Sequence, residues 1–169
     1  MANKSVSAFA KNGYGQVEPN HLSAQRTAQI YAQLPAKSDI EKLENGQYVK
    51  YDYENKQVNF SGDGEWMLVY NEEKVYGPGE TRKDFALTKE NQVGGIIVPR
   101  VFKTNVGDIY TTNFVAAGPY TVGDKLTINA TAGVPTKASG DSLQGIVLQV
   151  VENTTMPDGQ AAVKLMRIQ

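Results

Sequence analysis

The stretch that decides the fold reads Leu143-Gln-Gly-Ile-Val-Leu-Gln-Val-Val151, then the turn Pro157-Asp-Gly159, then Ala161-Ala-Val-Lys-Leu-Met-Arg-Ile168. Just upstream lie the run Tyr120-Thr-Val-Gly-Asp-Lys-Leu-Thr-Ile-Asn129 and the turn Gly133-Val-Pro-Thr136. Short β runs separated by turns at close spacing are typical of a small β-barrel or β-sandwich. Nothing in this stretch is equipped for catalysis, so it predicts a rigid scaffold with a structural or docking role.

The composition is that of a globular chain with almost no net charge. Apolar residues make up 40% of the 169 residues and charged residues 21%, which fits one folded domain and excludes a disordered chain. The chain has 17 Lys and Arg against 18 Asp and Glu, a net charge of -1, so it lacks the basic surface that binds nucleic acid. It has no cysteine, which excludes disulfides and thiolate metal sites. We expect no metal, because the chain has one histidine and Ser61–Glu65 lacks the later oxygen ligands of a calcium loop.

The sequence gives no sign of a membrane or secretory protein. Met1–Ser7 lacks the apolar run of a signal peptide. No apolar stretch approaches the length of a transmembrane helix. We expect a soluble protein that is made in a cytoplasm and has no membrane partner.

The composition changes near residue 45, which predicts two regions. Residues 1–44 are rich in Ala, Gln, Asn, Ser and Lys and poor in large aliphatic residues, so we interpret them as an N-terminal docking arm. Residues 45–169 are interpreted as a mainly β domain, with 45–103 and 104–169 as two candidate subdomains.

Within the arm, the pattern predicts one short helix from Ser23 to Leu34, which Pro35 ends. At about 100° per residue, Ile30, Tyr31 and Leu34 lie on one broad stripe of this helix. A further helical turn is expected over 38–43, where Ser38 and Glu41 have the spacing of a capping box.

The middle of the chain predicts further strands. Alternation or apolar runs mark the segments Val49–Tyr53, Gln57–Phe60, Trp66–Tyr70 and Val93–Val98. Pro99 interrupts the last of these runs, so we expect an edge or a bend there. Val-Gly-Asp appears twice, sixteen residues apart, at 106–108 and 122–124, each time before a strand. We interpret both copies as common strand-entry turns rather than as a sign of internal duplication.

The inventory of reactive side chains is small. His21 is the single histidine, so a hydrolase triad has no second histidine or cysteine to draw on. The pair Asp63 and Glu65 keeps a carboxylate glycosidase open as a third hypothesis, although a solvated turn is the simpler interpretation. Trp66 and the tyrosines at 51, 53 and 70 keep a second hypothesis open, a carbohydrate-binding β module.

Several segments resemble the auxiliary capsid proteins of tailed bacteriophages, which decorate or cement the head. The segments that carry this resemblance are the Val-Gly-Asp strand entries, Gly133–Thr136, Leu143–Val151, the closing strand after Asp158-Gly159, and the arm segments Ala10–Thr27 and Ile30–Pro35. The resemblance implies a β-rich domain on the outside of the shell, often trimeric, with an arm that reaches over neighbouring capsid subunits. It implies no catalysis and no cofactor.

Taken together, the residues and the resemblance predict a virion structural protein that binds the major capsid protein and is itself a homo-oligomer, with a trimer favoured. A tail, baseplate or head-fibre component is the alternative within the same class. We expect residues 1–44 to make much of the contact, centred on five apolar side chains: Phe9, Tyr14, Ile30, Tyr31 and Leu34.

Overall fold

The chain folds mainly into antiparallel β-sheet. The computed structural model describes residues 13–23, 33–71, 86–140 and 143–169. Strands account for 40% of the structure and helices for 4%, and the sheets do not close into a barrel in the described part of the chain. The mainly β prediction is confirmed, and of its two forms the sandwich-like one is observed.

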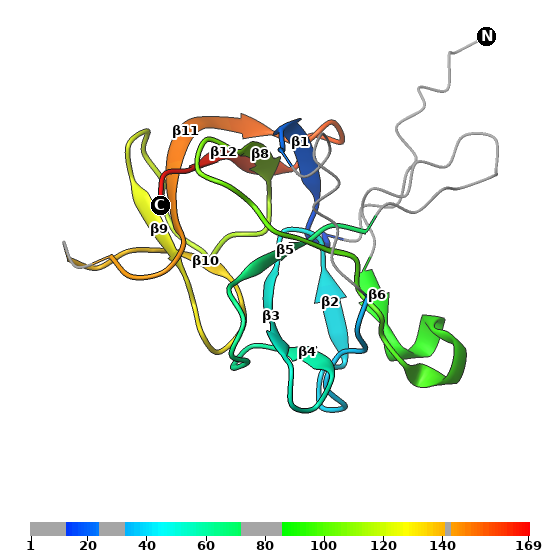
Figure 1. The fold of residues 1–169 in the computed structure, drawn as a ribbon. Coiled ribbons are helices and arrows are strands. Elements are labelled where there is room, and N and C mark those ends of the chain that lie inside the picture. Colours follow the sequence, from blue (N-terminus) through cyan, green and yellow to red (C-terminus); the bar gives the residue numbers. More distant parts are fainter. Residues whose placement is uncertain (1–12, 24–32, 72–85, 141–142) are drawn as a thin grey trace, which may run out of the picture.

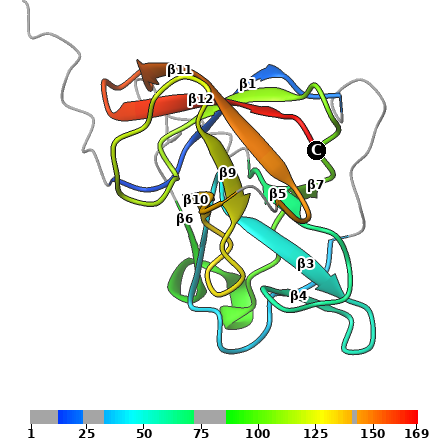
Figure 2. The ribbon, with the colours of Figure 1, turned by 90° about the vertical axis from the view of Figure 1, so that its left-hand side faces the viewer.

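The described strands form three sheets (Figures 1 and 2). Their bounds are β1 Val17–His21, β2 Lys42–Glu44, β3 Tyr48–Asp52, β4 Gln57–Asn59, β5 Met67–Val69, β6 Ala86–Thr88, β7 Val101–Phe102, β8 Ile109–Thr112, β9 Lys125–Ile128, β10 Pro135–Lys137, β11 Val147–Thr155 and β12 Ala161–Arg167. The six-stranded sheet has the order β1-β8-β12-β11-β9-β10, the four-stranded sheet β4-β3-β5-β7 and the two-stranded sheet β2-β6. Two 3₁₀ turns, η1 Lys89–Asn91 and η2 Val93–Gly95, follow β6.

The two strands and the turn predicted at the C-terminal end form the hairpin β11–β12, which is the centre of the six-stranded sheet. Its nine-residue strand β11 pairs with β12 on one side and with β9 on the other. The Pro157–Gly159 turn closes it, with the Gly159 N–H donating to the Met156 carbonyl at 2.8 Å. Alternate residues such as Val150 and Leu165 are buried, so one face of the hairpin forms core.

The two Val-Gly-Asp turns have the same geometry, which confirms their interpretation as strand-entry turns. Gly107 and Gly123 take left-handed backbones with φ of 93° and 95°. In each turn the aspartate backbone N–H donates to the carbonyl three residues earlier at 3.0 Å. The carboxylates of Asp108 and Asp124 accept the backbone N–H of that same earlier residue, at 2.8 and 2.9 Å. Each turn is therefore closed twice before its strand begins.

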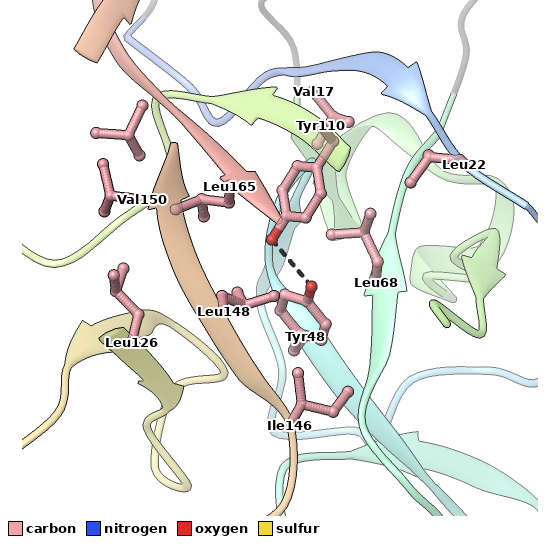
Figure 3. Close-up of a cluster of buried hydrophobic side chains, with 11 residues drawn as sticks. Val17, Leu22, Tyr48, Leu68, Tyr110, Leu126, Ile146, Leu148, Val150 and Leu165 are labelled. Atoms are coloured by element: carbon pink, nitrogen blue, oxygen red, sulfur yellow. Dashed lines mark hydrogen bonds between the residues drawn. The ribbon is translucent and has the colours of Figure 1, made fainter. Parts of the chain in front are cut away.

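Tyr48 and Tyr110 join the two larger sheets through one buried contact (Figure 3). Tyr48 comes from β3 and Tyr110 from β8, and their hydroxyls share a hydrogen bond of 2.9 Å. Burial raises the pKa of Tyr48 to about 12 and raises that of Tyr110 well above its usual value. Both phenols are therefore neutral at physiological pH. The apolar residues of this first core cluster are Val17, Leu22, Leu68, Leu126, Ile146, Leu148, Val150, Val163 and Leu165.

Neighbouring residues at the start of β3 face different cores. Tyr48 enters the first cluster, whereas Val49 and Tyr51 belong to a second cluster. The other buried members of this second cluster are Ile40, Leu43, Val58, Met67, Val69, Ile97 and Val101. At its start the strand therefore alternates between two apolar environments, whereas Lys50 and Asp52, on the same side as Tyr48, are only half-buried.

Gly133 lets the loop between β9 and β10 touch the start of β3. Its carbonyl accepts the Tyr48 N–H at 2.8 Å, and the Gln47 side chain donates to the Ala132 carbonyl at 2.9 Å. A Cβ at Gly133 would lie 1.9 Å from the Tyr48 carbonyl oxygen, and its φ is +65°. Only glycine satisfies both conditions.

The described part of the N-terminal region, 13–23, lies on the chain's own sheet. β1 pairs antiparallel with β8, and Val17 is buried in the first cluster. The Gln16 side chain is buried and donates to Asp158 at 2.8 Å, which ties this segment to the β11–β12 turn. The predicted helix Ser23–Leu34 lies largely outside the described residues, and its last two positions, Gln33 and Leu34, are not helical.

The helical turn expected over 38–43 is wrong. Residues 38 and 39 form a turn, and Lys42–Glu44 form β2, with Leu43 opposite Leu87 of β6. Leu43 is fully buried in the second cluster, between an exposed Lys42 and a half-buried Glu44. The alternation of these residues and their pairing with β6 outweigh the local capping pattern.

Replacing Gly133 with alanine is expected to destabilise the fold by more than about 3 kcal/mol, because it combines a left-handed backbone with a backbone clash. The matched control is Gly145→Ala. Gly145 has a φ of +74° but no atom within 4 Å of its added Cβ, so only the conformational cost of about 1–2 kcal/mol applies. Urea unfolding measures both variants. Equal losses would show that the contact with Tyr48 is unimportant.

Tyr48→Phe is expected to cost about 1–3 kcal/mol, because it leaves the buried Tyr110 hydroxyl without its partner. The double variant Tyr48→Phe/Tyr110→Phe removes both hydroxyls, so its loss is expected to be smaller than the sum of the two single losses. A double-mutant cycle by chemical unfolding measures this coupling. Strict additivity would contradict a direct hydroxyl–hydroxyl bond.

Candidate docking surface

One short segment gathers much of the exposed apolar surface. We call Val93–Val98 the apolar loop; it follows β6 and is part of the green coil at the outer margin of Figure 1. Val93 is 99% exposed, Ile96 56% and Val98 38%. The other exposed large hydrophobic side chains in the described residues lie in other segments, with no two of them close in sequence: Tyr53, Val106, Val122 and Val151. Clustered exposure of this kind marks interaction sites, whereas scattered single residues do not.

The local backbone explains why these side chains face outward. Val93–Gly95 form η2, in which Gly94 and Gly95 take left-handed φ values of 69° and 67°. The Gly95 N–H donates to the Gln92 carbonyl at 3.1 Å, which closes the turn. The chain then becomes extended at Ile96, so the reversal leaves Val93 at its tip. Two consecutive glycines permit this tight turn without the strain of a Cβ.

The apolar loop is held in place from its C-terminal side by Ile97. This side chain is 2% exposed and belongs to the second core cluster. The Ile97 carbonyl also accepts the Ala36 N–H at 2.7 Å. The loop therefore presents Ile96 and Val98 from a fixed backbone rather than as a free chain.

Lys89 fixes the N-terminal approach to the apolar loop. Its backbone N–H donates to the Glu41 carbonyl at 3.3 Å. Its ammonium group donates to the Ser38 carbonyl and pairs with the Glu41 carboxylate, both at 2.6 Å. With Ile97 on the other side, the loop is anchored at both ends.

The chemistry of the apolar loop suits an apolar protein surface. From Gln92 to Pro99 the sequence contains no charged residue. Burying a large aliphatic side chain contributes about 1.5–3 kcal/mol, so three such side chains provide a useful contact.

No group of three or more His, Cys, Asp or Glu that would hold a metal is present in the described ranges. Within those ranges, no helix has the length and hydrophobicity needed to cross a bilayer.

Two of the five side chains expected to contact a partner can be placed, and both make contacts within the chain. Tyr14 is half-buried, with the Lys42 ammonium 5.3 Å from the centre of its ring. Leu34 is half-buried and packs against the second core cluster. Phe9, Ile30 and Tyr31 lie outside the described residues.

The four aromatic residues predicted to form a carbohydrate-binding face are distributed over the two core clusters and the surface. Trp66 and Tyr70 pack against the first core cluster, whereas Tyr51 is buried in the second. Tyr53 is exposed and its ring centre lies 5.7 Å from that of Tyr51. The structure therefore does not bring these four rings together on one open face.

The polar residues considered for catalysis lie in exposed turns or at a sheet edge. Asp63 and Glu65 are exposed, and Glu65 pairs with Lys103 at 2.5 Å. His21 is exposed in the edge strand β1.

Asp52 closes the turn between β3 and β4. Its carboxylate accepts the backbone N–H of Asn55 at 3.0 Å and the side-chain amides of Asn55, Gln57 and Asn59 at 3.0–3.1 Å. These hydrogen bonds, that from the Asn55 backbone first, lower the pKa of the carboxyl group. The carboxylate thus has a structural role that requires its charge.

Sequence reasoning placed Val93–Val98 among the apolar runs of the β region, and therefore missed it as a surface. The signal that marks it is the Gly94-Gly95 pair, because two glycines between aliphatic residues indicate a turn rather than a buried strand.

Comparison with known proteins adds no assignment, because no family model, curated protein or solved structure matches this chain.

Ile97→Ala is expected to destabilise the protein by about 2–5 kcal/mol, because it opens a cavity in the second core cluster. Ile96→Ala removes an exposed side chain of the same kind and is expected to change stability by less than about 0.5 kcal/mol. Urea unfolding of the two neighbouring variants tests whether the apolar loop is anchored as described. Similar effects at both positions would contradict that arrangement.

Proposed function

We propose that this protein is a structural component of a virus particle, which binds the outside of a tailed-bacteriophage capsid and stabilises the shell by bridging capsid subunits. The observation that carries the proposal is the apolar loop, an uncharged, ordered and doubly anchored surface on a rigid β scaffold. The resemblance of the sequence segments to auxiliary capsid proteins supports the same function. On this proposal the protein acts by binding, and its place is the surface of the virion.

The size of the apolar loop favours a repetitive partner. A standard stable interface uses about 20–30 residues on each side, far more than this loop provides. A single contact through it is therefore weak. When many copies bind one shell and each touches more than one subunit, weak contacts add to a strong collective effect. The major capsid protein is the partner that offers this repetition, and a trimer of the present chain would multiply the contacts further.

The near-neutral charge of the chain is compatible with this function. A net charge of -1 provides no general attraction to nucleic acid, so binding depends on the shape and apolar chemistry of the partner surface. Such binding is expected to depend little on salt concentration.

Gradient-purified particles of the virus that encodes this chain are expected to contain it in a fixed ratio to the major capsid protein. Particles made without the chain should bind the purified protein, and Val93→Ser/Ile96→Ser should raise the concentration needed for half-saturation about tenfold or more. The control is Val106→Ser, since Val106 is 68% exposed but lies in a different turn.

Cryo-electron microscopy of the reconstituted particle gives the position of the bound chain. Density on the shell, touching two or more capsid subunits, supports the proposal. Density on the tail, baseplate or head fibre would replace the capsid function by the alternative in the same class. Particles that lack the chain altogether would contradict both.

A further inference from the structure

Within the apolar loop, Ile96–Val98 lies outside the named strands but has the burial pattern of an extended segment. Ile96 has extended backbone angles, φ -102° and ψ 112°. The exposed fractions of the three side chains alternate, at 56%, 2% and 38%. Alternation of this kind is the period of a β-strand with one face on a core.

One side of this segment is bonded through the Ile97 carbonyl, and its other side makes no backbone hydrogen bond within the described residues. Peptide groups of successive residues in an extended chain point to opposite sides. Because the Ile97 carbonyl accepts the Ala36 N–H at 2.7 Å, the Ile96 carbonyl and both peptide groups of Val98 point the other way. Across the described residues, no backbone hydrogen bond reaches the Ile96 carbonyl or either group of Val98.

This open edge lacks the usual protection against strand addition. Exposed edges are commonly protected by lysine, proline or a bulge. The edge strand β1 shows such protection, with Pro19 and a change of register between Pro19 and His21. Ile96–Val98 has no charge and no bulge, and its proline, Pro99, comes only after the strand. The edge is therefore suited to receive another strand.

We propose that Ile96–Val98 binds an extended strand of a neighbouring shell subunit by β-augmentation, which rests on the proposed function and specifies how it works. The partner strand would supply backbone N–H and C=O groups to the open edge and alternate aliphatic side chains to Val93, Ile96 and Val98. The uncharged sequence from Gln92 to Pro99 requires a partner strand without charges at these positions.

A second copy of this chain fits the edge less well as the occupant. Two copies joined through their apolar loops would use six residues each, whereas a stable interface uses about 20–30 residues per side. Such a pair would dissociate at ordinary concentrations. A shell presents the same strand many times in a fixed array, so it offers the collective binding that a free pair lacks.

Hydrogen exchange tests the backbone contact directly. In the free full-length chain, the peptide that covers 93–98 is expected to exchange quickly, and after binding to particles made without the chain its exchange should slow by about tenfold or more. A chain that binds the particles with unchanged exchange in 93–98 would overturn β-augmentation while leaving the proposed function intact. A chain that does not bind the particles at all would overturn the proposed function.

A pair of variants at Val98 separates the backbone from the side chain. Val98→Pro removes the outward N–H, whereas Val98→Ala keeps it and shortens the side chain. Particle binding should be about tenfold weaker for Val98→Pro than for Val98→Ala, the effect of one lost hydrogen bond. Unfolding midpoints show whether both variants are folded. Equal binding of two folded variants, or a stable dimer of the free chain that Val98→Pro dissociates, would contradict the proposal.

Discussion

Tyr48 lies in β3 of the four-stranded sheet, but its side chain packs in the first core cluster with residues of the six-stranded sheet. Tyr48 is fully buried. Its hydroxyl shares a hydrogen bond with the Tyr110 hydroxyl, and its backbone N–H donates to the Gly133 carbonyl. A buried hydroxyl without a partner is costly, so each sheet fixes where the other must lie. With this contact in place, the opposite face of β3 is left to form the second core cluster with Val49 and Tyr51.

The candidate docking surface depends on that second cluster. Ile97 fills a place in it, and the backbone on either side turns Val93, Ile96 and Val98 to the outside. A surface built in this way does not have to order itself on binding, which saves the entropy that a free loop would lose.

Local sequence patterns predicted the strands whose own residues carry the apolar pattern, such as β3, β11 and β12. Local patterns failed where residues distant in sequence determine the secondary structure. Lys42–Glu44 is a strand because it pairs with β6, despite a helical capping pattern at 38–41. Val93–Val98 looks like other apolar runs, and only the position of Ile97 in the core shows which side chains are exposed. Tyr14 and Leu34 were predicted to contact a capsid partner, and the contacts that the structure shows for them are within the chain.

The place of β1 beside β8 has a consequence for how the protein is made. Val17 is paired with Thr112, and the other neighbour of β8 is β12, which begins only at Ala161. A chain grows from its N-terminus, so β1 leaves the ribosome long before the strands that complete its sheet. Pairings between such distant residues are slow to form. The sequence of β1, VEPNH, has a single large aliphatic residue, so the waiting strand exposes little apolar surface to other nascent chains.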